Sequence, residues 1–501
     1  MKRTAYIGLA IVALVPMLTR AQDQTDALRY SQLGFGGTAR FMAMGGAFTA
    51  LGGDPSVLSF NPGGLAIFNK SQITFSPGFN MRTNSATFNG SSASTPDYAA
   101  TIQNAAWIAS WKNRNDDAMW KSINVGIAYN RTNDFNSSIN IQGSNTNSTL
   151  LDVYVNNANH NYPSQLDPFS TMQAYNANGL IYSNGNDSNS YSNVIRPFLG
   201  VNGNAVLQQK SIQTTGSMGE TDFSVGGNYK NKLYIGASLG IADIVYNENA
   251  SYTETPLYND SLFGLQSWNL ATTLSTHGAG LNFKIGAIYK ITDWLRVGGA
   301  VHTPTWFQLT DDYSSYITAN YVNTPFYPNG GGTWSGTATQ SPATGSYNYT
   351  LVTPFRAMGG LAFVIHHQAI ISADYEFVDY STALLSSADA GTFTQANNAI
   401  KAYYMPASNL RVGVELVLYP FSIRAGYTYY GNPYSSSAGN SSIRNSYSAG
   451  IGIKIDRCFI DLAYVLTQYS ENYYMYDQTL EPAAALKNTV SDMVLTLGVN
   501  F

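Results

Sequence analysis

The amino-acid sequence predicts an all-β fold, a transmembrane antiparallel β-barrel of about 14 strands with an N-terminal hatch inside its lumen. Three observations predict it. Apolar and polar residues alternate in about fourteen separate segments, and a closed bacterial barrel requires an even number of strands. Every second connection between these segments is short. Only 11% of the residues are charged, against about 25% in a typical soluble domain, while tyrosine and glycine reach 36 and 45 residues.

The first 21 residues have the pattern of a secretory signal peptide. Lys2 and Arg3 precede an apolar run over 5–18, and 19–21 form a small-x-small pattern for cleavage after Ala21. The alternative, an uncleaved membrane anchor, is disfavoured because a spanning helix needs about 20 apolar residues. A signal peptide together with a barrel pattern predicts a location in the outer membrane of a Gram-negative bacterium.

Residues 22–70 do not alternate as a strand does, and they predict a compact plug. Asp54 is suited to cap a short helix with Pro55 at its first position, and Asn61 ahead of Pro62 predicts that this helix ends near Phe60. The segment is too short for a domain, and its apolar side chains disfavour exposure to water. We therefore expect a hatch inside the lumen, the alternative being a loose periplasmic tail.

Residues 71–501 are predicted to form the barrel wall. Short turns alternate with long loops rich in Ser, Asn, Gly and Tyr, which places the turns at the periplasmic rim and the loops outside the cell. The longest predicted surface loop covers about 134–218. The expected strands are 71–82, 102–112, 120–133, 219–230, 232–248, 276–290, 294–310, 346–365, 369–383, 402–418, 421–431, 443–455, 458–470 and 489–501.

The last strand shows the alternation most clearly. Leu495, Leu497, Val499 and the C-terminal Phe501 share one face, which is expected to contact lipid. A C-terminal strand that ends on an aromatic residue resembles the signal read by the barrel-assembly machinery. That machinery and outer-membrane lipid are therefore predicted partners.

Charged residues in the opposite phase of the strands are expected to face the lumen. An Arg or Lys on the lipid face at the bilayer midplane would cost about 2–4 kcal/mol. Because the set contains both signs, a structural network of ion pairs and hydrogen bonds is favoured over a role in ion selectivity. The predicted network comprises Arg296, Arg356, Glu376, Arg411, Glu415, Arg424 and Asp461.

The hatch region resembles that of a known transporter family. Residues 45–51 read Gly-Gly-Ala-Phe-Thr-Ala-Leu, Asp54 follows, and 61–66 read Asn-Pro-Gly-Gly-Leu-Ala. This pattern is similar to the hatch of the FadL/TodX family of outer-membrane transporters for long-chain fatty acids and aromatic hydrocarbons, although Gly63 stands where that family usually has alanine. The resemblance implies a plugged barrel from which hydrophobic ligands leave sideways at a kink in the third strand. In this chain, the alternation of that strand breaks only near 130–134.

The resemblance also implies a function, the passive uptake of hydrophobic small molecules without a cofactor. The hatch is expected to be the gate, because it is the only segment outside the barrel that is placed to block the lumen. The predicted ligand-binding and gating residues are Phe41, Met44, Phe48, Phe60, Asn61 and Pro62.

Other functions are open as alternatives. An enzyme is not expected, and no catalytic residue is predicted among the five histidines; with a single cysteine, no metal site is expected either. A haem receptor would use His277 and His302 as axial ligands, a general porin would need no hatch, and a surface adhesin would use the long loops. The net charge of −4 argues against nucleic acid, and we expect a monomer.

Overall fold

The computed structural model describes residues 23–501 apart from positions 116, 178, 185–186, 261, 325–333, 366–367 and 390. The predicted signal peptide, residues 1–21, lies outside the described residues. Among the residues that the structure describes, no helix is long and apolar enough to cross a membrane.

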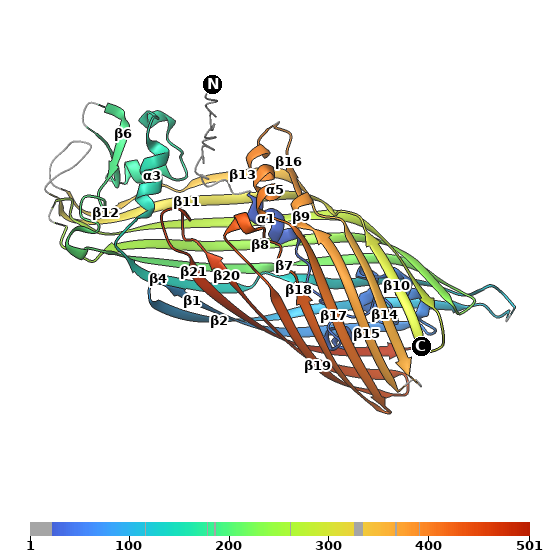
Figure 1. The fold of residues 1–501 in the computed structure, drawn as a ribbon. Coiled ribbons are helices and arrows are strands. Elements are labelled where there is room, and N and C mark those ends of the chain that lie inside the picture. Colours follow the sequence, from blue (N-terminus) through green and yellow to red (C-terminus); the bar gives the residue numbers. More distant parts are fainter. Residues whose placement is uncertain are drawn as a thin grey trace, which may run out of the picture.

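Nineteen strand segments join in one antiparallel sheet that closes on itself (Figure 1). Five of these segments continue a neighbouring one, so the wall has fourteen strands, as predicted. The first and last strands pair to close the barrel, with Ile73 opposite Val499 and Phe75 opposite Leu497. The wall strands, with continuing segments given together, are β1 (Gln72–Phe88), β2 (Ser91–Lys112), β3 and β4 (Trp120–Asp134, Ser137–Asn145), β7 (Val206–Tyr229), β8 (Leu233–Pro256), β9 (Leu265–Lys290), β10 and β11 (Leu295–His302, Trp306–Thr324), β12 to β14 (Trp334–Thr339, Ala343–Val352, Arg356–Ile365), β15 and β16 (Ala369–Asp379, Leu384–Ser386), β17 (Pro406–Leu418), β18 (Phe421–Tyr430), β19 (Arg444–Ile455), β20 (Cys458–Tyr473) and β21 (Ala484–Asn500).

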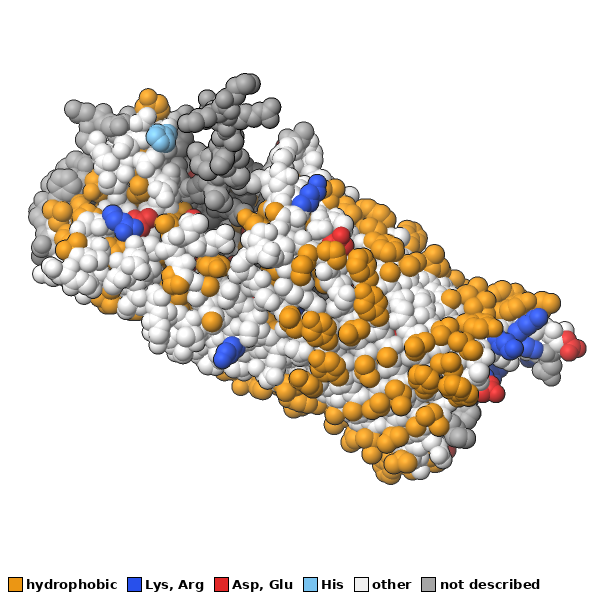
Figure 2. All heavy atoms as spheres, in the orientation of Figure 1, with side chains coloured by type: hydrophobic (Ala, Val, Ile, Leu, Met, Phe, Trp, Pro, Cys, Tyr) orange, Lys and Arg blue, Asp and Glu red, His pale blue; other side chains and the backbone are white. Residues whose placement is uncertain are grey.

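The wall has an apolar outer face and a more polar inner face. On β21, Leu495, Leu497 and Val499 are 36–46% exposed, whereas Val494 and Thr496 are buried. Figure 2 shows hydrophobic side chains gathered over the half of the barrel that ends in the short turns. An apolar band of this kind faces lipid in outer-membrane barrels. The chain is therefore an outer-membrane β-barrel of the Gram-negative type.

Several strands are longer than predicted, and some are interrupted. β7 and β8 have 24 residues each and β9 has 26, whereas a bilayer needs about 9–11, so these strands continue beyond the membrane. The seventh wall strand breaks at 303–305 and its neighbour at 353–355. Pro304 and Pro354 lie in these breaks, and a proline cannot donate a ladder hydrogen bond.

The structure corrects the predicted loop 134–218, because both of its ends are strands. β4 pairs with β7 from Ser137 opposite Thr214 to Asn145 opposite Val206. The sequence does not reveal this pairing, since the two segments alternate among Ser, Asn, Gln and Thr with few apolar residues. Residues 146–205, the cap, fold over the extracellular end (Figure 1, upper left). The cap contains α3 (Leu150–Ala158), η3 (Pro163–Gln165), α4 (Thr171–Asn176), β5 (Ile181–Asn184), β6 (Asp187–Asn193) and η4 (Val201–Gly203), and other loops contain η5 (Tyr380–Thr382), α5 (Thr394–Tyr403) and η6 (Ser436–Ala438).

The N-terminal segment lies inside the barrel as four short helices, drawn in blue in Figure 1. They are α1 (Gln24–Ser31), α2 (Ala39–Ala43), η1 (Pro55–Ser59) and η2 (Pro62–Ile67). The Asp54 carboxylate accepts a hydrogen bond from the Ser56 amide at 3.0 Å, which caps η1. η2 packs against β7, β8 and β9, whereas α2 packs against β18 to β21. The hatch therefore contacts two separate sectors of the wall.

Glycines in the wall let the hatch backbone approach closely. A Cβ added at Gly298 would lie 2.1 Å from the Thr49 carbonyl oxygen, and one added at Gly236 would lie 2.2 Å from the Pro62 carbonyl oxygen. A larger residue at either position would push the hatch away from the wall, so part of the glycine content serves this contact.

Candidate functional site

The contact zone between hatch and wall is the candidate functional site, and Asn61 is central to it. The Asn61 side chain is fully buried, and its amide nitrogen donates to the Thr49 carbonyl at 2.6 Å and the Ala287 carbonyl at 3.2 Å. Its amide oxygen accepts a hydrogen bond from the Gly63 amide at 3.0 Å. Pro62 follows as the first residue of η2. One side chain thus fixes two turns of the hatch and ties them to β9.

The predicted aromatic and methionine residues form the core of the hatch. Phe41, Met44 and Phe48 are 0% exposed and Phe60 is 7% exposed. The ring centroid of Phe41 lies 5.2 Å from that of Phe48 and 4.9 Å from that of Phe60. In this arrangement the four side chains pack against one another and offer no open surface to a ligand.

An ionic network joins the hatch to β17, β18 and β20. The Arg40 guanidinium pairs with Glu415 at 2.6 Å, Glu415 pairs with Arg424 at 2.6 Å, and Arg424 pairs with Asp461 at 2.5 Å. Three of these residues belong to the predicted lumen set. Arg40 was not predicted, and its only signal in the sequence is a single charge within an apolar run.

A second network lies at the end of α1. The Glu376 carboxylate bridges the guanidinium groups of Arg356 and Arg411, and Arg356 also donates to the Ser31 carbonyl. Removing one partner of a buried ion pair costs about 3–5 kcal/mol, so the first network ties α2 to the wall through Arg40 and Glu415. The second network reaches the hatch through the hydrogen bond from Arg356 to Ser31. Arg296 stands apart from them and donates to the Leu51 carbonyl at 3.0 Å.

A third network combines Lys284 of β9 with two acidic residues of β7. The Lys284 ammonium lies 2.7 Å from Glu220 and 2.6 Å from Asp222, and the Ser59 hydroxyl of the hatch donates to Asp222 at 2.5 Å. The period-two pattern of Glu220 and Asp222 was the available signal, since it places both side chains on the inner face. The three networks surround the hatch with charge pairs.

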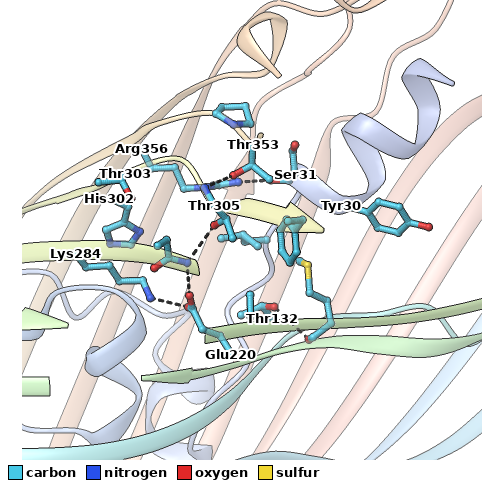
Figure 3. A pocket seen from close by; sticks show the side chains of 16 residues that line it. Tyr30, Ser31, Thr132, Glu220, Lys284, His302, Thr303, Thr305, Thr353 and Arg356 are labelled. Carbon is cyan, nitrogen blue, oxygen red and sulfur yellow. Dashed lines mark hydrogen bonds and ion pairs between the residues drawn. The ribbon is translucent and has the colours of Figure 1, made fainter. Parts of the chain in front are cut away.

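A small cavity of about 30 Å³ lies among the second and third networks (Figure 3). Figure 3 shows Lys284 beside Glu220, and Arg356 reaching the carbonyl of Ser31. The ring nitrogen Nε2 of His302 lies 2.6 Å from the Phe60 carbonyl oxygen. A cavity of this size has room for water but not for an organic ligand.

A larger cavity of about 140 Å³ lies between hatch residues 33–36 and the wall. Its wall side is formed by β1, β3, β18, β19, β20 and β21, with Gln103 of β2 at one edge. The lining combines apolar groups, such as Phe35 and Val490, with the charged side chains of Arg82 and Asp492. It is the larger of these two cavities.

The wall is irregular next to this larger cavity. β3 shifts register against β7 between Arg131 and Asn133, and the third wall strand is interrupted at 135–136. The pairing of β2 with β3 ends where Asn104 lies opposite Asn130. The irregularity therefore falls where the sequence alternation breaks.

The two histidines of the haem alternative do not share a site. His302 is buried inside the barrel, whereas His277 of β9 is exposed. The sequence pair His366 and His367 lies outside the described residues. Within the described part of the chain, no group of three or more His, Cys, Asp or Glu side chains could hold a metal ion.

No family model matches the chain, and no curated protein matches it. Solved structures do match it over most of its length. The toluene transporter TodX of Pseudomonas putida has a TM-score of 0.50 at 12% identity, covering 93% of this chain and 99% of that chain. A Pseudomonas aeruginosa FadL homologue has a TM-score of 0.50 at 13% identity, with the same coverage. A TodX mutant described as a monoaromatic hydrocarbon channel has a TM-score of 0.51 at 12% identity, covering 93% and 98%.

The two TodX structures are described as a toluene transporter and a monoaromatic hydrocarbon channel, and the third structure as a homologue of FadL. At such low identity, the likeness concerns the fold alone. The chain has the fold of the FadL and TodX outer-membrane proteins, as its hatch motif predicted.

Proposed function

We propose that this chain takes up small hydrophobic molecules passively across the outer membrane, without a cofactor. The observation that supports this best is the cavity of about 140 Å³ between the hatch and the irregular third strand. A cavity in a plugged lumen, beside an interrupted wall strand, offers both a binding site and a sideways path. The descriptions of TodX as a toluene transporter and a monoaromatic hydrocarbon channel also support it. Aromatic hydrocarbons and long-chain fatty acids are the first ligands to test.

The sideways path would run between β2 and the third wall strand. The part of β2 that precedes Asn104 shares no backbone ladder with the third wall strand, and side chains join the two strands there instead. The Ser138 hydroxyl donates to the Asp97 carboxylate at 3.0 Å, and the Asn140 amide donates to the Thr95 hydroxyl at 3.1 Å. Two such contacts near the surface separate at a lower cost than a continuous ladder of backbone hydrogen bonds.

In this proposal the gate is a local part of the hatch. The ionic networks and Asn61 hold the body of the hatch in place, whereas the glycine-containing segment 33–36 borders the cavity. That segment is tied to β3 by a hydrogen bond from the Gly34 amide to the Thr132 carbonyl at 2.7 Å. Phe41, Met44, Phe48 and Phe60 would contact a ligand only after the hatch opens, and Asn61 with Pro62 would hold the closed position.

The test is uptake of labelled oleate and labelled toluene by cells that lack their own transporter. Wild type should raise the uptake of at least one of them. Asn61→Ala, or removal of residues 34–64, should change that uptake while the barrel still inserts. Asn398→Ala on the exposed face of α5 is the matched control and should behave as wild type.

Two results would replace this function with another. Free passage of sugars without uptake of either hydrophobic compound would make the protein a general porin. A haem spectrum that depends on His302 would make it a haem receptor, although the contact of His302 with the Phe60 carbonyl argues against that role.

A further inference from the structure

The larger cavity has a chemistry that a neutral hydrocarbon does not require. Three arginines line it, Arg82 on β1, Arg131 on β3 and Arg444 on β19. Asp134 and Asp492 are the carboxylates in the lining, so the lining has one excess positive charge. Guanidinium groups in a partly enclosed site favour an anion, because screening by water is weak there.

The arginines keep hydrogen-bonding capacity. Arg131 pairs with the Asp134 carboxylate at 2.9 Å, and Arg82 donates to the Asp134 carbonyl at 3.2 Å. The Nε atoms of Arg82 and Arg131 are buried and have no hydrogen-bond partner among the described residues. Glu471 lies outside the lining and accepts a hydrogen bond from Asn488 at 3.2 Å. Each of these two N–H donors is closed to water in this arrangement, so an acceptor in the cavity reaches it only when the guanidinium turns toward the cavity.

The rest of the lining is apolar and limits the size of the occupant. Phe35 stacks on Tyr430 with ring centroids 6.3 Å apart, and Met42, Val465 and Val490 complete this side. The volume of about 140 Å³ is close to that of an apolar cavity of about 150 Å³ that binds benzene. A long acyl chain exceeds this volume, whereas a single substituted ring fits.

We propose that the cavity binds a compact carboxylic acid, an aromatic monocarboxylate in particular. Its carboxylate accepts hydrogen bonds from Arg82 and Arg131, and its ring lies against Phe35 and Val490. This inference rests on the proposed function and names the class of compound that the same site selects.

Benzoate, with toluene and benzamide as neutral analogues, is the probe for the purified wild-type protein in detergent. Benzoate should bind more tightly than either analogue. Arg82→Gln and Arg131→Gln should each weaken benzoate binding at least about tenfold and leave toluene binding unchanged, because a hydrogen bond to a charged group is lost. Arg114→Gln, in an exposed periplasmic turn, is the matched control. Arg131→Lys keeps the charge and should restore part of the affinity, and heat-modifiable mobility shows that each variant is folded.

Uptake by cells separates failure of this inference from failure of the proposed function. If toluene enters but benzoate neither binds nor enters, the cavity is a hydrocarbon site and the inference is wrong, while the proposed function stands. If no hydrophobic compound enters, the proposed function itself is wrong. Benzoate binding that survives both glutamine variants would also overturn the inference. The inference would also be wrong if the wild-type protein bound palmitate but not benzoate, and if the glutamine variants lost the binding of palmitate.

Discussion

At the scale of single residues, Asn61 shows how one side chain can keep the hatch closed. It makes three hydrogen bonds, to Thr49, Ala287 and Gly63, from a fully buried position. Because the site is fully buried, each partner group left unpaired when the side chain is removed costs about 1–3 kcal/mol.

We therefore expect Asn61→Ala to loosen the hatch without unfolding the barrel. The free energy of local opening should fall by about 1–3 kcal/mol for each group left unpaired. Hydrogen exchange over residues 34–64 measures this opening, and Asn398→Ala serves as the control. Unchanged protection of the hatch amides would show that Asn61 does not hold it.

The environment of Glu481 predicts that the stability of one extracellular loop depends on pH. It lies in the loop between β20 and β21, and its Oε1 accepts a hydrogen bond from the Tyr476 amide at 2.7 Å. Its Oε2 is buried without a partner among the described residues. Burial raises the pKa of Glu481 from 4.5 to about 7, although the Tyr476 hydrogen bond and the charge of Lys210 lower it. The folded loop therefore favours the protonated carboxyl.

Because the pKa of Glu481 is raised in the folded state, this carboxyl stabilises the folded loop at low pH and not at high pH. The contribution to stability is complete below the ordinary pKa of 4.5 and is lost as pH rises through about 7. We expect the loop 474–483 to exchange its amide hydrogens faster, after correction for intrinsic rates, at pH about 8 than at pH about 5. Glu481→Gln should remove this difference. An equal dependence on pH in the variant would place the titrating group elsewhere.

The residues of the site were only partly predictable from the sequence. Strand phase placed Arg356, Glu376 and Arg411 inside the barrel, because a charge on the lipid face is costly. Phase does not reveal which charges pair across strands, so the partnership of Lys284 with Glu220 was missed. The apolar hatch residues were predicted to meet a ligand, yet composition alone does not distinguish a surface from a packed core.

At the scale of elements, the sequence predicts strands well only where they cross lipid. There an apolar face must alternate with a polar one, and all fourteen wall strands were found by that pattern. Outside the membrane both faces of β4 and of the first half of β7 meet water or polar side chains, so the pattern is absent and the strands were mistaken for loop. The interruptions at 303–305 and 353–355 have visible causes, Pro304 and Pro354. That the two breaks lie side by side depends on the register of the strands.

The last strand should decide whether the barrel assembles. Leu497 is 46% exposed on the lipid face and pairs with Phe75 and Ile460, and the Phe501 amide donates to the Ser71 carbonyl at 2.9 Å. Arg at a midplane lipid position costs about 2–4 kcal/mol and Asp somewhat less. We expect Leu497→Asp and deletion of Phe501 to lower the amount of folded protein in the outer membrane, with Leu497→Val as control. Normal heat-modifiable mobility and normal surface levels in both variants would refute this.

At the scale of the whole molecule, the lumen is covered at one end by the cap and filled farther down by the hatch. The cap is held by Glu254 of β8, a buried carboxylate that accepts hydrogen bonds from the Leu150 amide at 3.0 Å and the Trp268 indole at 2.9 Å. The hatch is held by the ionic networks and by Asn61. The two closures use different anchoring residues, so we expect each to hold without the other.

This independence predicts that the hatch alone seals the barrel. Asn145 lies opposite Val206, so an Asn-Gly turn could replace the cap, residues 146–205, without moving β4 or β7. Cells with this variant should exclude a large antibiotic as well as wild type does, because the hatch still fills the lumen. Removal of residues 34–64 should instead make cells sensitive, because an unplugged fourteen-stranded barrel leaves a water-filled path. Growth inhibition, compared at equal amounts of folded protein in the membrane, measures both effects. Sensitivity caused by loss of the cap would mean that water already passes beside the hatch, and the seal would then belong to the extracellular end.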